Sequence, residues 1–391
     1  EEALAEEKSI IQKPEQVVVV SNPKTPKSKM RIVFKEELSI GKAEGDENYM
    51  FGSFIIFNTD KEGNFYVTDW DRRRIQKYDT EGKYLLTIGR QGQGPGEFQN
   101  LTIARFDKDG HFYVTDLANR RISFFDTEGK YLRQIPIPDV FENLYINSRE
   151  YFVASCSKRL GDDITAGWRI VDGLFDEKFN PVAEFHSTIF SPKPPEGRDM
   201  TSMAKFTAGI ISNGAFQPRA MHTIADNDYI YFGYPENYTV DIYSPEGIKT
   251  KTITRKYDPI EVGEKDKEYF VSNIAENFMR GRAEDFKKEA IRFIQYPKYK
   301  PAYHSFALME NGWLAVVVEF IENEYTLFDL FDEEGTYIGN FKANIPPDGL
   351  FFKSGKAYAI AAEEGYQFAK RYSFEVQEYR DNKWMIKNNI H

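Results

Sequence analysis

The sequence predicts an all-β fold, a six-bladed β-propeller, from an internal repeat, its turn residues and its strand pattern. Residues 60–88 and 107–135 are nearly the same sequence displaced by 47 positions, and a repeat of this length is typical of propellers, solenoids and arrays. Each copy has short strands rich in Phe, Tyr and Val, separated by turns that contain Asp and Gly. Four short antiparallel strands in about 45 residues make one propeller blade.

The first copy illustrates how the strands of one blade follow from the sequence. An apolar run at 54–57 is followed by a turn from Asp60 to Gly63, where Gly supplies the positive φ of a tight turn. The second strand is expected at 65–68 and the third around 75–78, and a second Gly-containing turn leads into the fourth. The copy at 107–135 has the same parts, so it predicts a second blade.

Weaker copies of the repeat continue along the chain and set the number of blades. We expect blades three to six over residues 151–185, 222–254, 304–341 and 350–379. The last of these supplies only three strands. Residues 31–41 resemble the fourth strand of blade one, so we expect this N-terminal strand to complete blade six and close the ring, leaving no free sheet edge. The predicted propeller therefore spans residues 31–391.

Three segments fall outside the repeat. Residues 1–30 are charged and contain prolines, which favours a linker or tether with one strand around Val17–Val20. Residues 189–220 form a loop insertion that contains Pro, Gly and Ser. Residues 262–295 are expected to be a helical insertion between blades four and five, because their apolar residues recur at helical spacing. These are Phe270, Ile274 and Phe278, and then Phe286, Ala290 and Ile294.

Composition excludes several classes of partner. The 391 residues carry a net charge of −10, whereas nucleic acids and anionic membranes need a basic surface. No run of 18 apolar residues is present, so we expect no transmembrane segment. Cys156 is the single cysteine, which excludes an intrachain disulfide and a thiolate metal cluster. The chain begins at Glu1, as a processed secreted protein would, and we expect an extracytoplasmic location.

Two motifs carry a resemblance to a known family. Phe112–Ile122 reads F-Y-V-T-D-L-A-N-R-R-I and Gly89–Phe98 reads G-R-Q-G-Q-G-P-G-E-F. Both resemble the NHL repeat of six-bladed β-propellers, most of all the bacterial extracytoplasmic ones, and the resemblance is specific over residues 31–137. It implies a propeller that binds a protein, peptide or glycan. Some relatives are enzymes, namely amidating lyases, strictosidine-synthase-like proteins and lactonases, so the resemblance indicates fold better than activity.

Both insertions occupy links from the outer strand of one blade to the inner strand of the next, and such links lie on one face at the mouth of the central channel. Each insertion is followed within a few residues by a histidine at the start of an inner strand. We therefore expect a ligand-binding site at the channel mouth formed by His222, His304, Arg219 and Tyr303. The two histidines would hold a divalent metal or act as acid and base. The alternative is that both are partly buried and bond to backbone or water.

These observations predict an extracytoplasmic binding propeller that recognises a partner or ligand at the inserted face. A metal-dependent lyase or hydrolase of the amidating-lyase or lactonase kind, using His222 and His304, is an alternative. A catalytic zinc usually needs a third protein ligand, and the sequence nominates none. A further alternative is a structural subunit of a surface assembly, in which residues 1–30 mediate self-assembly by adding the Val17–Val20 strand to a neighbour.

Overall fold

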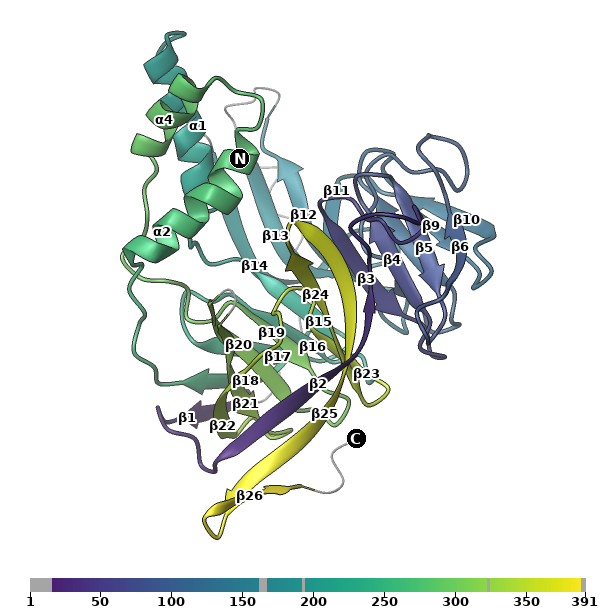
Figure 1. Ribbon diagram of the computed structural model, residues 1–391, viewed down its shortest axis with the longest axis vertical. Coiled ribbons are helices and arrows are strands. Elements are labelled where there is room, and N and C mark those ends of the chain that lie inside the picture. The colour runs from purple at the N-terminus through teal and green to yellow at the C-terminus, as the bar shows by residue number, and fades with distance from the viewer. Residues whose placement is uncertain (1–15, 162–166, 192–193, 322–323, 388–391) are drawn as a thin grey trace.

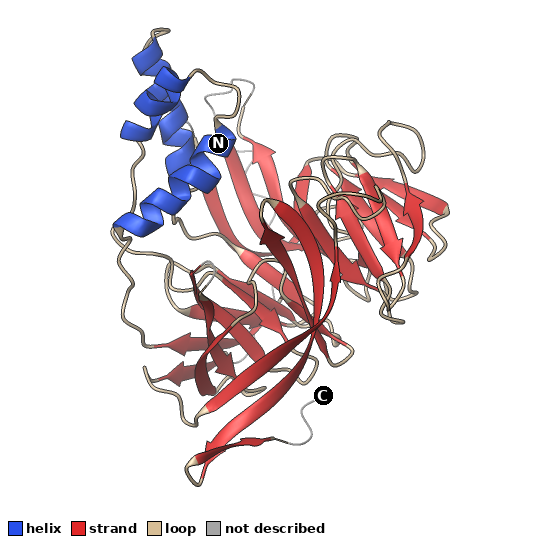
Figure 2. Ribbon diagram, viewed as in Figure 1, coloured by secondary structure: helices blue, strands red, loops and turns tan. Residues whose placement is uncertain are grey.

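The computed structural model describes residues 16–161, 167–191, 194–321 and 324–387, and it contains six sheets, each built on four antiparallel strands and arranged as propeller blades (Figures 1 and 2). The prediction of an all-β six-bladed propeller is confirmed. In blades one to five, four consecutive strands run from the inner to the outer edge of the sheet, and in blade six the outer strand comes from the N-terminal part of the chain.

The first three blades each have four strands. Blade one contains β3 (Ile55–Thr59), β4 (Phe65–Asp69), β5 (Arg74–Tyr78) and β6 (Tyr84–Ile88). Blade two contains β7 (Arg105–Phe106), β8 (Phe112–Asp116), β9 (Arg121–Phe125) and β10 (Tyr131–Pro136). Blade three contains β11 (Val140–Ile146), β12 (Phe152–Arg159), β13 (Trp168–Phe175) and β14 (Pro181–Phe190). Blade three therefore begins one strand earlier than the expected residue 151, because β11 precedes it.

The remaining blades complete the ring. Blade four contains β15 (Met221–Ile224), β16 (Ile230–Gly233), β17 (Thr239–Tyr243) and β18 (Lys249–Arg255). Blade five contains β19 (Ser305–Leu308), β20 (Leu314–Ile321), β21 (Tyr325–Phe331) and β22 (Tyr337–Ala343). Blade six contains β23 (Phe351–Lys353), β24 (Lys356–Glu363) and β25 (Tyr366–Arg380), and its outer strand is β2 (Met30–Ile40).

The two ends of the chain meet in blade six, as predicted. β2 pairs antiparallel with β25, from Met30 opposite Glu378 to Ile40 opposite Ala369. A short strand, β26 (Lys383–Ile386), pairs with the far end of β25. Because β2 follows the linker and β25 precedes the C-terminus, this pairing closes the ring with main-chain hydrogen bonds (Figure 1).

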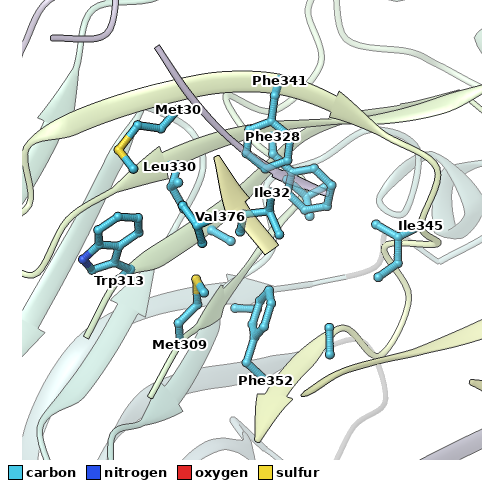
Figure 3. Close-up of a cluster of buried hydrophobic side chains, with 14 of the residues drawn as sticks. Met30, Ile32, Met309, Trp313, Phe328, Leu330, Phe341, Ile345, Phe352 and Val376 are labelled. Atoms are coloured by element: carbon cyan, nitrogen blue, oxygen red, sulfur yellow. The ribbon is translucent and has the colours of Figure 1, made fainter. Parts of the chain in front are cut away.

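Six apolar clusters join each blade to the next, including blade six to blade one. Figure 3 shows the cluster between blades five and six, where side chains of β2 and β25 pack against those of blade five. Its labelled members are Met30, Ile32, Met309, Trp313, Phe328, Leu330, Phe341, Ile345, Phe352 and Val376. The core is thus a ring of interfaces between blades.

The glycine of the last turn in a blade sits directly against the outer strand of the preceding blade. A Cβ added to Gly129 would lie 2.7 Å from Cγ1 of Ile88, and one added to Gly335 would lie 2.7 Å from Cγ1 of Ile253. Gly82 and Gly247 face the preceding blade in the same way. These glycines also have positive φ, which the turn requires. The backbone conformation of the turn and the close contact with the preceding blade therefore both favour glycine at this position.

Residues 16–29, expected to be part of a linker, follow the rim of the propeller. β1 (Val18–Asn22) pairs in parallel with β18 on the outside of blade four. Asn22 is buried, and its Nδ2 donates to the carbonyl oxygens of Thr254 and Gly335 at 3.1 and 2.9 Å. Its Oδ1 accepts the backbone N–H of Tyr337 at 2.8 Å. Asn22 therefore ties blade four to blade five from outside.

The insertion at 189–220 differs from its prediction as a loop, because it contains α1 (Met200–Ser212). Asp199 caps this helix by accepting the backbone N–H of Ser202 at 3.0 Å. The apolar face consists of Ala204, Ala208 and Ile211, which recur at helical spacing. The insertion at 262–295 is helical as predicted, with α2 (Glu264–Phe270), a π-helical segment (Val271–Ala275), α3 (Glu276–Phe278) and α4 (Glu284–Arg292).

We predict that replacing a turn glycine by alanine lowers the free energy of unfolding by an amount that depends on which atoms the new Cβ meets. Gly110→Ala meets no atom within 4 Å and suffers only the strain of φ +84°, which is about 1 kcal/mol. Gly129→Ala has a similar φ of +82° but also collides with Ile88, so it should cost at least about 1 kcal/mol more. Urea unfolding of both variants measures the difference, and equal costs would contradict the proposed role of the interface.

We also predict that Asn22→Ala lowers the free energy of unfolding by about 2 kcal/mol, because it leaves buried backbone groups of two blades without a partner. Asn237→Ala is the matched control, since Asn237 is exposed and should change stability by less than about 0.5 kcal/mol. Denaturant unfolding checks both values, and a loss for Asn22→Ala no larger than that of the control would contradict a stabilising role of Asn22 between blades four and five.

Candidate functional site at the base of the helical cap

The two insertions form a single helical cap. Their buried side chains pack in one cluster that is separate from the interfaces between blades, and Figure 2 shows the helices gathered in one place. Ala204, Ala208 and Ile211 come from the first insertion, and Phe270, Ala290 and other apolar residues from the second. Because both insertions link an outer strand to the next inner strand, the cap stands on one face of the propeller.

His222 lies in β15 and faces blade three. It is 8% exposed, and its Nε2 lies 2.8 Å from the carbonyl oxygen of Asn143, to which Nε2–H donates. Its ring lies edge-on to Tyr145 with the ring centres 5.7 Å apart. Burial lowers the pKa of His222, so the imidazole is neutral at pH 7. This is the geometry of a buried histidine bonded to backbone, which was one of the two alternatives.

Tyr303 does not lie at the channel mouth. Its side chain is fully buried in the interface between blades four and five, and its hydroxyl donates to the carbonyl oxygen of Thr239 at 2.7 Å. The ring packs against Tyr238 with the centres 5.3 Å apart. The expectation that Tyr303 contacts a ligand is therefore wrong in this structure, because a residue next to the inner strand can face a neighbouring blade as well as solvent.

Arg219 lies near enough to His304 for its charge to affect the pKa of that histidine. His304 precedes β19, and its side chain is accessible to solvent although protein surrounds it on several sides. Burial lowers the pKa of His304, the Asp348 carboxylate raises it, and the Arg219 guanidinium lowers it. Arg219 and Asp348 are exposed and belong to the links before blades four and six. Arg219 and Asp348 therefore influence His304 electrostatically, and a ligand site that includes His304 and Arg219 stays a prediction.

Neither His222 nor His304 has a complete set of metal ligands within the described ranges. Among those residues, Asp107, Asp109 and His111 are the group of three whose ligand atoms lie within 4.8 Å of one another. Asp107 already accepts the backbone N–H groups of Asp109 and His111, both at 3.0 Å, as the turn of each early blade requires. The turn explains why these three residues lie close together. They are not part of the site predicted at His222 and His304, so they add no ligand for a divalent metal there.

A groove of about 290 Å³ lies at the base of the cap, next to Arg219 in the sequence. Its walls come from the links on both sides of blade four and from the turn after β16. The lining residues are Phe216, Gln217, Pro218, Pro235, Glu236, Tyr257, Pro259, Pro297, Lys298, Tyr299, Lys300 and Pro301. Five of these twelve are prolines and three are aromatic, so the groove presents rigid rings with few backbone donors.

Backbone hydrogen bonds hold the walls of this groove together. The backbone N–H of Lys300 donates to the carbonyl oxygen of Ile260 at 2.8 Å, and the backbone N–H of Val262 donates to the carbonyl oxygen of Lys298 at 3.0 Å. Ala302 N–H donates to Pro235 at 2.8 Å, which attaches the link to blade four. The Lys300 ammonium lies between Asp266 and Glu319 at 2.8 and 3.0 Å, so its charge is balanced within the protein.

Sequence reasoning missed this groove, although a signal was present. Pro297 and Pro301 stand two residues on either side of Tyr299 in the segment that follows the helices, and Pro259 precedes them. Prolines alternating with aromatic residues beside an insertion indicate a rigid, exposed link. Tyr299 is 40% exposed and lies with its ring 4.8 Å from the Lys298 ammonium.

Comparisons with known proteins agree with the fold. A family model, DUF5128, described as a six-bladed β-propeller, matches residues 56–185. No curated protein matches the chain. A Bacteroides fragilis protein provisionally classed as exported has a similar structure, with a TM-score of 0.54 and 11% identity over 93% of this chain and 100% of the other. At this identity the similarity shows the fold alone.

Two further solved structures are similar at a lower level. A member of the DUF4221 family from Bacteroides vulgatus has a TM-score of 0.49 and 9% identity, over 90% of this chain and 99% of the other. Virginiamycin B lyase from Staphylococcus aureus has a TM-score of 0.40 and 9% identity, over 93% of this chain and 90% of the other. Within the part of the chain that the structure describes, no helix is long and apolar enough to cross a membrane.

We predict that buried His222 makes the free energy of unfolding fall in mild acid. An unfolded histidine has a pKa of about 6.5, and burial lowers the pKa of His222 in the folded chain. Below pH 6.5 the unfolded state therefore binds protons that the folded state does not. Neutral His222 makes its full contribution to the free energy of unfolding above pH 6.5. Below pH 6.5 this contribution declines by up to about 1.4 kcal/mol per pH unit.

The measurement is urea unfolding between pH 7.5 and 5.5. The decline should be smaller in His222→Gln than in the natural sequence, because glutamine has no proton to gain. An equal decline in both proteins would contradict a buried neutral His222.

Proposed function

We propose that this propeller is a binding protein that recognises its partner or ligand on the face that carries the helical cap. The single observation that carries this proposal is the groove at the base of the cap, with its five prolines and with Phe216, Tyr257 and Tyr299. Concave surfaces lined by aromatic side chains with a few polar groups are typical of binding sites. Large elaborations of one face of a repeated scaffold also favour recognition at that face.

The groove is well suited to binding because its shape exists before a ligand arrives. Proline fixes its own backbone, and the hydrogen bonds of Val262, Lys300 and Ala302 fix the segment that carries Tyr299. Little conformational entropy is then lost on binding, which favours affinity. Glu236 and Lys298 are exposed among the lining residues and offer one charge of each sign to orient a ligand.

The other two functions receive less support from the geometry. A metal-dependent lyase or hydrolase would need His222, but Nε2 of that residue is engaged with Asn143. A surface assembly through residues 1–30 would need the Val17–Val20 segment to pair with a neighbour. Val18–Asn22 pairs with β18 of the same chain, so such an exchange would first have to break this pairing.

We also infer an extracytoplasmic location, where a protein, peptide or glycan ligand would be met. The resemblance to extracytoplasmic propellers and the similar structure of a protein provisionally classed as exported support this inference. A fusion to a reporter that is active only outside the cytoplasm tests it, using the full-length gene.

We predict that the purified chain binds members of an array of immobilised oligosaccharides and peptides, and that Tyr299→Ala reduces this binding at least about tenfold, because it removes an exposed ring from the groove. Tyr366→Ala is the matched control, since Tyr366 is similarly exposed but belongs to blade six. Equal losses in both variants, or unchanged binding in Tyr299→Ala, would place recognition elsewhere.

A further inference from the structure

Among the described arginines with a buried Nε that makes no hydrogen bond, one also has no polar partner for its terminal nitrogens. Five arginines have a buried Nε with no hydrogen bond, namely Arg74, Arg105, Arg121, Arg255 and Arg371. Four of them bond through their terminal nitrogens to backbone carbonyls. Arg105 is the exception, and its one interaction is with an aromatic ring.

Arg105 is the first residue of β7, the innermost strand of blade two, and it is half-buried. Its guanidinium carbon lies 3.4 Å from the ring centre of Tyr145, which belongs to β11, the innermost strand of blade three. Tyr145 in turn contacts His222 of blade four. The three side chains form a row across the inner edges of three consecutive blades.

A guanidinium that is stacked on a ring still has hydrogen-bonding capacity to satisfy. The ring interacts with the face of the guanidinium, whereas all five N–H groups lie in its plane and point outward. No carboxylate lies within 4 Å of Arg105 among the described residues, and Asp107, two positions along, is occupied by its own turn. The Nε of Arg105 is buried without a hydrogen bond, and such a polar group is unfavourable unless a partner is supplied.

We propose that Arg105 anchors an oxyanion site at the inner edge of the interface between blades two and three. The ligand is a carboxylate or phosphate group, because these anions accept two parallel N–H bonds from a guanidinium edge. Tyr145 holds the guanidinium in one plane, which presents the edge in a fixed direction. This site is separate from the groove at the base of the cap, so it does not depend on the function proposed above.

Isothermal titration of the purified chain with inorganic phosphate and with succinate, at constant ionic strength in sodium chloride, tests the proposal. We expect saturable binding of at least one of them, and the preferred anion identifies the source of the oxyanion. Arg105→Gln should weaken that binding at least about tenfold, as expected for the loss of charged hydrogen bonds.

Arg133→Gln is the matched control. Arg133 stacks on Phe124 of the same blade at 3.8 Å, but it is exposed on the outer strand β10, so its loss should leave anion binding unchanged. If Arg105→Gln does not fold, as judged by circular dichroism, Arg105→Lys decides by the same criterion, because it keeps the charge and loses the planar fork. Absence of saturable binding to the natural sequence, or equal affinity in the Arg105 variant that folds, overturns the site.

Discussion

The pairing of β2 with β25 is the interaction on which the rest of the structure depends. It joins Met30 to Glu378 and Ile40 to Ala369, so hydrogen bonds of the main chain connect the two ends of the sequence. Without β2, blade six would be a three-stranded sheet with an open edge, and the interface with blade five would lose Met30 and Ile32. The interfaces on both sides of blade six, and through them the ring, rely on a strand contributed from the far end of the chain.

Strand β1 and a buried polar network also hold blades four and five together. Asp329 is fully buried and accepts the hydroxyls of Tyr238 and Tyr337 at 2.6 and 2.7 Å, and Arg255 pairs with it at 3.0 Å. Buried charges of this kind are favourable only when every lone pair is satisfied, which fixes the relative position of the two blades. Tyr238 also packs against Tyr257, a wall of the groove, at 5.8 Å. The groove therefore rests on an interface that is held in a single arrangement.

The blades could be predicted from the sequence wherever turn chemistry is local. Asp107 and Gly110 stabilise their turn through contacts inside the hairpin. This copy of the repeat can therefore be recognised from the local sequence alone. β11 was missed because its register shifts at Asn143, which adopts φ 51° and breaks the alternation. α1 was missed because its buried face is mostly alanine. For the site, the packing between blades decides which way a residue before an inner strand faces: Tyr303 is buried between blades four and five, whereas the adjacent His304 is exposed, and the sequence does not show this difference.

Blades two and six carry different residues at one equivalent position of the inner strand, Arg105 and Phe351. Arg105 lies opposite Tyr113 in its ladder, as Phe351 lies opposite Tyr358 in blade six. Phe351 stacks on Tyr358 with the ring centres 4.7 Å apart, so an apolar ring satisfies this position completely. An arginine in its place adds a charge that the fold neither needs nor neutralises among the described residues. Arg105 is half-buried with an Nε that makes no hydrogen bond, and the proposed oxyanion ligand would account for this arginine by supplying the counter-charge.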